Sequence, residues 1–251
     1  HSVGLRAPGV CGVPRVRRHR VVVNRIRHRI VFSVLVLAVV GLTACSSNKG
    51  SGAGRNGDDG VTELAGSDVA ARLDSIPAGR PGAEDVAGLV RMREEELLAR
   101  DLYLALGDRW GTKIFANISS AEQTHTDAVK ALLDRSAIAD PAADHTSGRF
   151  TDPELQSLYS SLLAEGSRSL VDALTVGATV EELDLADLAA RATDIPDIAW
   201  VYANLERGSR NHLRAFVRQL GRNGAGFTPS YVAQSDFDSI ISSDMERGSG
   251  T

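Results

Sequence analysis

The sequence predicts an all-α fold in which four long helices form a bundle. From Ala83 to Leu220, apolar residues recur at the three- and four-residue steps that place them on one face of a helix. The alternation of a half-buried strand is scarce in this range, and aromatic residues make up only 5% of the chain. The connection between the second and third apolar stripes is the longest, so we expect two helical hairpins joined by a long crossover.

The first predicted hairpin contains helices over residues 84–106 and 114–135. The first helix is expected to end at Gly107, because glycine is common just after the last turn of a helix. A longer connection over residues 136–166 follows. It contains a short helix opened by Thr151-Asp-Pro-Glu154, a typical helix start.

The second predicted hairpin contains helices over residues 167–191 and 195–220. Pro196 is favourable in the first turn of the second of these helices, and Gly221 follows its end. Residues 230–243 predict a small additional helix that packs on the bundle. We therefore assign residues 81–225 to the four-helix domain and residues 226–251 to a C-terminal extension.

Residues 1–44 are typical of a secretory signal and are excluded from the fold. A run of arginines precedes a short apolar segment, Ile30 to Val40, and Leu42-Thr-Ala-Cys45 follows. The segment is too short for a comfortable membrane span. The last four residues resemble a bacterial lipobox, which predicts cleavage before Cys45, lipidation of that cysteine and an exported, membrane-anchored protein. The alternative is an ordinary signal peptide with an incidental Cys45.

Residues 45–80 are expected to form a flexible Ser/Gly-rich linker between anchor and domain. The sequence opens with His1 and has a long basic region, so we expect the true translation start to lie after His1. Removing residues 1–44 removes eight of the 28 basic residues and none of the 32 acidic ones, which leaves 20 basic residues and a net charge of −12. This charge argues against a nucleic-acid partner.

Each predicted long helix has polar residues in the middle of its apolar stripe. In order along the chain, these interruptions are Glu96, then Glu122 and His125, then Glu181 and Asp184, then Ser209 and His212. Burying such groups without partners is costly, which indicates that they share a function in the core. A Glu-x-x-His pair such as Glu122 and His125 is the ligand unit of dinuclear metal sites in helical bundles, and two helical hairpins with a long crossover are the connectivity of ferritin-like bundles.

Four carboxylates and two imidazoles suit a pair of divalent metal ions. Iron is the first expectation and manganese the second, because such ligands favour these metals over copper or structural zinc. Two divalent cations also balance four carboxylate charges, which offsets most of the penalty of burying them.

Several assignments stay open at the level of sequence. A single carboxylate on a helix stripe is often a boundary residue whose charged end reaches water. Glu95 is an alternative to Glu96, and Glu182 is an alternative to Glu181. His145 lies among turn-forming residues and is expected to be a solvated loop residue.

Three segments carry a family resemblance: Arg93 to Tyr103, Ser120 to His125, and Arg207 to Phe216. Together they resemble the ferritin-like family known as domain of unknown function 2202, over roughly Ala87 to Tyr231. More distantly, the spacing of Glu96 and Tyr103 is similar to the first helix of rubrerythrins. The resemblance implies a four-helix bundle with a dinuclear metal centre and no established activity.

One position departs from the pattern of ferritins and their relatives. They usually have a glutamate one turn before the histidine of the fourth helix, where this chain has Ser209. We expect Asp184 to supply the missing carboxylate, with Ser209 beside the ligands. Tyr103 is expected to be a hydrogen-bond donor next to them or an electron relay, although a packed tyrosine with a satisfied hydroxyl is the simpler alternative.

The sequence therefore predicts an exported, membrane-anchored ferritin-like protein with a dinuclear iron or manganese centre. Ferroxidase or peroxide-reducing activity would make dioxygen or peroxide its substrate. The alternative is a non-enzymatic metal-binding or structural and interaction lipoprotein. The sequence leaves open whether the domain forms a homodimer.

Overall fold

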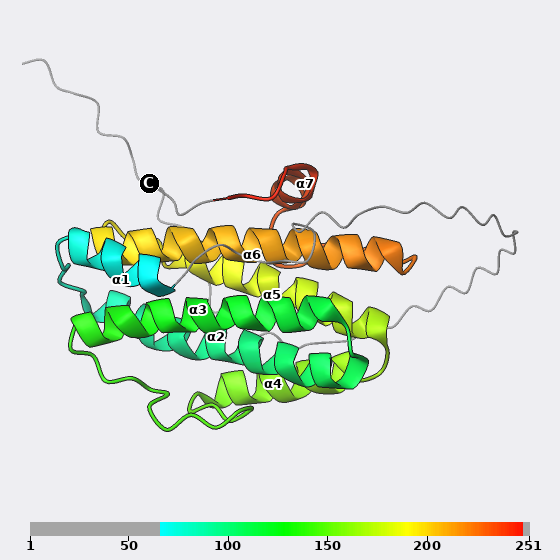
Figure 1. Ribbon diagram of the computed structural model, residues 1–251, viewed down its shortest axis with the longest axis horizontal. Helices are drawn as coiled ribbons and strands as arrows, with labels where there is room; N and C mark the ends of the chain where they lie inside the picture. Colours follow the sequence, from blue (N-terminus) through cyan, green and yellow to red (C-terminus); the bar gives the residue numbers. More distant parts are fainter. Residues whose placement is uncertain (1–65, 248–251) are drawn as a thin grey trace, which may run out of the picture. The chain divides into compact units, whose positions relative to one another are not determined.

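The computed structural model describes residues 66–247, and within this range it contains seven α-helices and no strand (Figure 1). The helices are α1 (Gly66–Ser75), α2 (Ala83–Trp110), α3 (Lys113–Arg135), α4 (Pro153–Gly166), α5 (Leu170–Ala190), α6 (Pro196–Arg222) and α7 (Gln234–Ser242). The predicted all-α class is confirmed. The short helix in the long connection is α4, and the small helix near the C-terminus is α7.

The four long helices pack in the pairs that the connectivity predicts. Helices α2 and α3 form one extensive contact and α5 and α6 another, while α3 also contacts α6 and α2 also contacts α5 (Figure 1). Helix α4 lies against α2 and α5, α1 lies against α3, and α7 lies against α6. The side chains of the long helices therefore meet in one shared interior.

The end of helix α2 differs from the prediction. Helix α2 continues through Gly107 to Trp110 and ends at Gly111, whose φ of 65° is the left-handed conformation that favours glycine. Gly107 instead allows a close approach between helices, because a Cβ there would lie 3.3 Å from Cβ of Phe115 on α3. Gly107 is a packing position within α2, and the predicted helix end at Gly107 is wrong.

Helix α1 lies within residues 45–80, which the sequence analysis assigned to a flexible linker. Val69 and Leu73 lie one turn apart and are buried, and they belong to the same apolar cluster as Val129 and Leu132 of α3. Arg135 of α3 donates a hydrogen bond to the carbonyl of Ile76, just after α1. The predicted linker is wrong for residues 66–75, because two apolar residues at helical spacing are enough to dock one short helix.

The interior has two apolar clusters. One gathers around Leu102, Phe115 and Phe216, and the other around Met92 and Leu205. Each of α2, α3 and α6 contributes residues to both clusters. Between them along each helix lie Glu96 of α2, Glu122 and His125 of α3, and His212 of α6. A polar layer therefore crosses an otherwise apolar core.

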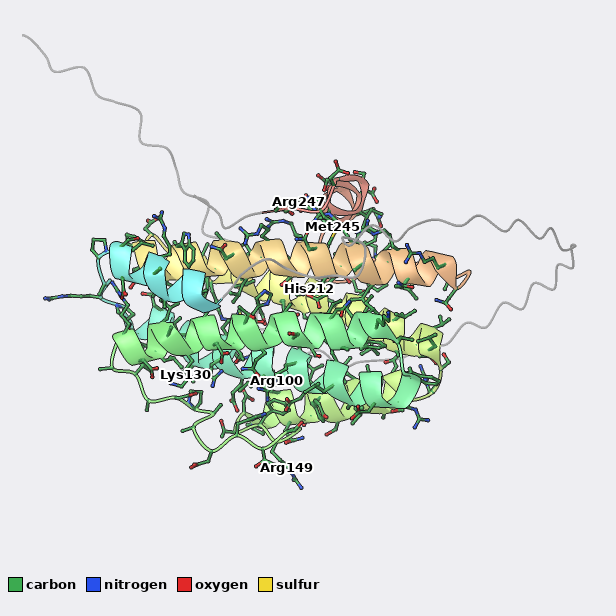
Figure 2. The ribbon with its side chains drawn as sticks, in the orientation of Figure 1. Arg100, Lys130, Arg149, His212, Met245 and Arg247 are labelled. Atoms are coloured by element: carbon green, nitrogen blue, oxygen red, sulfur yellow. The ribbon has the colours of Figure 1, made fainter. Side chains whose placement is uncertain are left out.

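The C-terminal segment after α6 lies on the outer side of that helix, where Met245 and Arg247 are seen beside α7 (Figure 2). Glu246 pairs with Arg210 and Arg214 of α6 at 2.6 and 2.9 Å. Phe237 of α7 is buried in the core. No helix within residues 66–247 is long and apolar enough to span a membrane. The predicted signal over residues 1–44 and Cys45 lie outside the described residues.

Candidate metal centre

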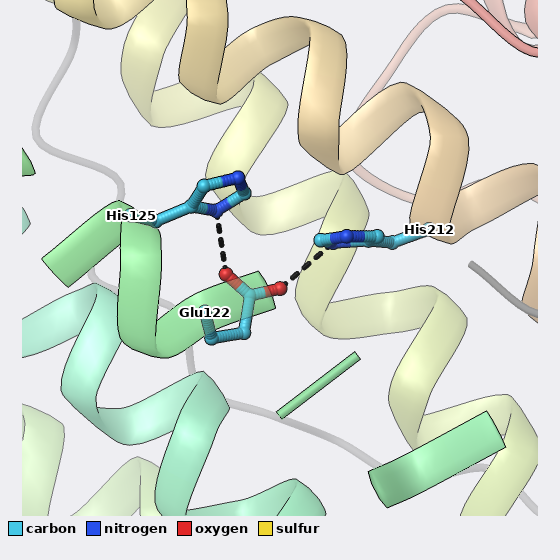
Figure 3. Close-up of side chains that lie close together, drawn as sticks. All are labelled: Glu122, His125 and His212. Carbon is cyan, nitrogen blue, oxygen red and sulfur yellow. Dashed lines mark hydrogen bonds and ion pairs between the residues drawn. The ribbon is translucent and has the colours of Figure 1, made fainter. Parts of the chain in front are cut away.

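Glu122 of α3 joins two imidazoles at the middle of the polar layer (Figure 3). Its Oε2 lies 2.7 Å from Nδ1 of His125, one turn further along α3, and its Oε1 lies 2.8 Å from Nδ1 of His212 on α6. All three side chains are fully buried. Their ligand atoms are close enough together to hold a metal ion.

A second glutamate approaches each imidazole from another helix. Nδ1 of His125 lies 3.2 Å from Oε2 of Glu96 on α2, and Nδ1 of His212 lies 3.4 Å from Oε2 of Glu181 on α5. Each Nδ1 therefore faces one oxygen of Glu122 and one oxygen of a second glutamate. The two halves of the site repeat the same arrangement on either side of Glu122, and the imidazole rings lie 5.4 Å apart between centroids.

Carboxylates control the charge of the imidazoles. Burial by itself would lower the pKa of His125, but Glu122 and Glu96 raise that pKa well above its usual value. Burial also opposes the charged form of His212, yet Glu122 and Glu181 raise its pKa to about 9. In turn, the two imidazoles outweigh burial and hold the pKa of Glu122 well below its usual value. The imidazoles therefore favour the charged form of Glu122.

The other carboxylates at the centre have raised pKa values. Burial raises the pKa of Glu96 to about 8 and also raises the pKa of Glu181. Burial followed by the negative charges of Glu96 and Glu181 raises the pKa of Asp184 well above its usual value. The metal-free centre thus retains protons that a cation would displace.

Several buried oxygens at the centre make no hydrogen bond of regular geometry among the described residues. They are both oxygens of Glu96, Oε2 of Glu181 and Oδ2 of Asp184. Buried polar atoms are nearly always satisfied, so this concentration needs an explanation. Carboxylate oxygens and imidazole nitrogens are ligands of iron and manganese, so the donor set fits the metals predicted from the sequence.

The structure distinguishes the alternative glutamates. Glu96 faces His125, whereas Oε1 of Glu95 accepts a hydrogen bond from Arg91 at 2.6 Å. Burial, followed by the neighbouring Asp187, raises the pKa of Glu95 to about 8. Glu182 accepts hydrogen bonds from the backbone amides of Ser230 and Val232 and so holds the segment before α7. Helical periodicity selected the inward-facing residue of each pair.

Tyr103 and Ser209 have different surroundings. The hydroxyl of Tyr103 is 2.6 Å from Oε1 of Glu181, to which it donates, and its ring packs between Phe115 and Phe216. It thereby holds one candidate ligand in place. Ser209 is buried, but its hydroxyl donates to the carbonyl of Leu205 on its own helix at 3.2 Å.

Asp184 lies one turn after Glu181 on α5 and is 4% exposed. It borders a small cavity between α2, α4 and α5. The charges of Glu96 and Glu181 act on Asp184, so it lies near the centre. The cluster whose ligand atoms converge contains Glu122, His125 and His212.

The sequence did not predict the surroundings of His145 or the role of Gly208. His145 is not a solvated loop residue, because its Nε2 lies 2.8 Å from Oδ2 of the buried Asp101 and its side chain is 11% exposed. Gly208 of α6 faces His125, and a Cβ there would lie 2.4 Å from both Cε1 and Nε2 of the imidazole. A glycine inside a strongly helical pattern, next to a polar interruption of the stripe, was the available signal.

Comparisons with known proteins find similarity to a family of uncharacterized domains and to a protein of known structure. The family described as "Uncharacterized protein domain (DUF2202)" matches residues 85–244. The uncharacterized protein MJ0754 of Methanocaldococcus jannaschii is 49% identical over 178 residues, which are 70% of this chain and 96% of that protein. The crystal structure of hypothetical protein MJ0754 is similar with a TM-score of 0.67 and 48% identity, covering 68% of this chain and 99% of that one.

Proposed function

This chain belongs to the DUF2202 family of uncharacterized protein domains, and we propose that it is a ferritin-like four-helix metalloprotein that binds two iron or manganese ions. The observation that carries this proposal is the repeated geometry around Glu122. Each of its oxygens faces the Nδ1 of a different histidine, and each histidine faces a further glutamate. One carboxylate with an oxygen directed to each half suits a bridging ligand between two ions.

The residues divide into two sets around this bridge. Glu96 and His125 would hold one ion, and Glu181 and His212 would hold the other, with Glu122 shared. Asp184, one turn after Glu181, is the fourth carboxylate available. Two divalent cations would balance the charge of four carboxylates, which offsets most of the cost of burying the cluster.

The chain's own side chains provide further parts of such a site. Tyr103 fixes the orientation of Glu181 through its hydroxyl. The apolar clusters on both sides restrict water around the centre. The raised pKa of His212, about 9, means that metal binding would release a proton from Nδ1. When bound, iron or manganese would supply one-electron redox chemistry with dioxygen or peroxide, which supports a ferroxidase or peroxide-reducing activity.

A second candidate function is non-enzymatic metal binding. Every side chain that faces the imidazoles is fully buried. In a closed site of this kind, a bound metal ion would hold the four helices together, or the protein would store the ion without turnover.

We also propose that the protein acts at the cell envelope as an exported lipoprotein. The lipobox-like Leu42-Thr-Ala-Cys45 after a basic and apolar segment supports this placement. Replacing Cys45 with alanine is then expected to abolish membrane partitioning and to remove the lipid mass from the mature protein. Unchanged partitioning and mass would refute the anchor.

Metal content tests the proposed centre directly. After loading with Fe²⁺ or Mn²⁺, inductively coupled plasma mass spectrometry is expected to find two metal ions per chain, and His125→Ala is expected to lower this number. His145→Ala is the matched control, because His145 is also largely buried but pairs with Asp101 away from the centre. No metal in the folded native protein would refute the proposal.

Redox cycling separates the two candidate functions. If the iron-loaded protein turns over with dioxygen or peroxide, and His125→Ala does not, the enzymatic function holds. If metal raises the unfolding temperature but no turnover is seen, the non-enzymatic function holds.

A further inference from the structure

A cavity of about 60 Å³ lies between α2, α4 and α5, next to the proposed metal centre. Leu98, Leu155 and Val180 form apolar parts of its wall. Three carboxylates also border it, Glu95 from α2 and Asp184 and Asp187 from α5. A space of this size holds a few water molecules or a partly hydrated ion.

Three carboxylates on α5 connect this cavity with the centre. Glu181, Asp184 and Asp187 follow one another at three-residue steps, so they lie on one side of the helix. Exposure increases along this line: Glu181 is fully buried, Asp184 is 4% exposed, and the side chain of Asp187 is 37% exposed. The line therefore leads from a candidate metal ligand to the protein surface.

The cavity also contains carboxylate oxygens that lack hydrogen-bond partners. Oδ2 of Asp184 is buried without a donor. Oε2 of Glu95, a residue that is 7% exposed, has no basic or amide donor, and the carboxyl groups of Glu95 and Asp187 lie beside each other. A buried carboxylate without a partner is costly in a space too small for bulk water. These two oxygens indicate that the cavity accommodates a cation.

The surrounding arginines do not reach Asp184 in any ion pair of the described chain. Arg91 contacts Glu95 at 2.6 Å and Asp152 at 2.5 Å, so two carboxylates share its charge. Arg191 contacts Asp187 at 3.0 Å. Two guanidinium groups thus lie near the outer carboxylates, whereas the inner one has no cationic partner.

We propose that this acidic cavity is the path by which divalent cations reach the buried centre. Asp187 and Glu95 bind the incoming ion at the outer end, in competition with Arg91, and Asp184 passes it to Glu96 and Glu181. This inference rests on the proposed function, because it requires a metal ion at the centre. It adds a transient cation-binding site between the protein surface and the metal ligands. At this site the incoming ion displaces Arg91 from Glu95.

The rate of metal uptake tests the path separately from the amount bound. Metal-free full-length protein is mixed with Co²⁺ in a stopped-flow instrument, and the visible absorbance of bound Co²⁺ is followed. Asp187→Asn is expected to slow uptake about tenfold and to weaken its dependence on salt. Arg91→Gln is expected to accelerate uptake. Both variants should reach the Co²⁺ content of the native protein at equilibrium.

The matched control is Asp134→Asn, which removes an exposed carboxylate on α3 that pairs with Lys130. It should load at the native rate. If Asp187→Asn and Arg91→Gln both load at the native rate while the native protein binds Co²⁺, the path is wrong and the metal centre stands. If the folded native protein binds no Co²⁺ after long incubation, both proposals are overturned.

Discussion

The imidazole of His125 lies directly against the backbone of Gly208, so that a methyl group on Gly208 would be 2.4 Å from His125 Nε2. This distance is too short for any contact between a carbon and a nitrogen atom that are not bonded. The position of His125 beside Glu122 therefore requires a residue without a side chain at position 208 of α6.

Gly208→Ala is expected to displace His125 and lower metal content, because the ring cannot keep its Nδ1 beside Glu122 and Glu96. Overpacking should also cost about 1–3 kcal/mol in the free energy of unfolding. Gly221→Ala on the same helix is the control, because nothing lies within 4 Å of its added Cβ. Metal content and urea unfolding measure both effects. Native metal content in folded Gly208→Ala would show that the imidazole has room to move.

Glu122→Gln is expected to destabilise the metal-free protein by about 3 kcal/mol at pH 7, because both imidazoles lose their charged partner in a buried site. It should also remove metal binding, since one neutral amide replaces the shared carboxylate. Denaturant unfolding without metal and metal analysis measure the two results. Glu165→Gln, at a partly exposed glutamate on α4, is the control. Equal stability of native and Glu122→Gln protein would contradict the pairing of Glu122 with His125 and His212.

Tyr103→Phe keeps the ring between Phe115 and Phe216 but removes the donor to Glu181. It is expected to lower the free energy of unfolding by about 1–3 kcal/mol, because the buried Glu181 oxygen loses its hydrogen bond. If Glu181 holds one ion, the variant should bind that ion more weakly and the other normally. Stepwise Co²⁺ titration followed by absorbance measures this, and two unchanged affinities would exclude a role for the hydroxyl in positioning Glu181.

Acid is expected to release the C-terminal segment from α6. Hydrogen bonds from Arg210 lower the pKa of Glu246 below its ordinary 4.5 despite partial burial. A lowered pKa means that this pairing stabilises the fold above pH 4.5 and is lost as the pH falls through the lowered value. The protection factors of the amides in residues 234–247, which correct for the slower intrinsic exchange in acid, should therefore fall at acidic pH. In Glu246→Gln, the amides of this segment should be less protected at pH 7 than in the native protein, and their protection should change less in acid. If acid lowers protection equally in the variant and the native protein, groups other than Glu246 cause the effect.

Removing α1 is expected to destabilise the domain, because Val69 and Leu73 are buried against residues of the core. A chain that starts at Pro77 should lose about 3–6 kcal/mol relative to one that starts at Val61, since each large apolar side chain contributes about 1.5–3 kcal/mol when buried. Thermal or urea unfolding compares the two. The double variant Val69→Ala, Leu73→Ala should reproduce most of the loss. Equal stability of the chains that start at Pro77 and Val61 would show that residues 66–75 act only as a linker.

The sequence by itself determined the helical class, the positions of the long helices and the residues of the polar layer. Helical periodicity is a local property, and a three- or four-residue step places Glu122 and His125 on one face whatever surrounds them. It also selected Glu96 over Glu95, because Glu96 continues the apolar stripe of Leu89 and Met92 at a four-residue step and Glu95 does not. These predictions needed no knowledge of how the helices pack.

Tertiary structure decided everything that depends on contacts between helices. The docking of α1, the role of Gly107 in close packing and the pairing of His145 with Asp101 each join residues of different elements. The same holds for the space that Gly208 leaves for His125. The amino-acid sequence contains the helical propensity of each segment. The distance between two side chains on different helices depends on how the whole core packs, and this packing exists only in the folded protein.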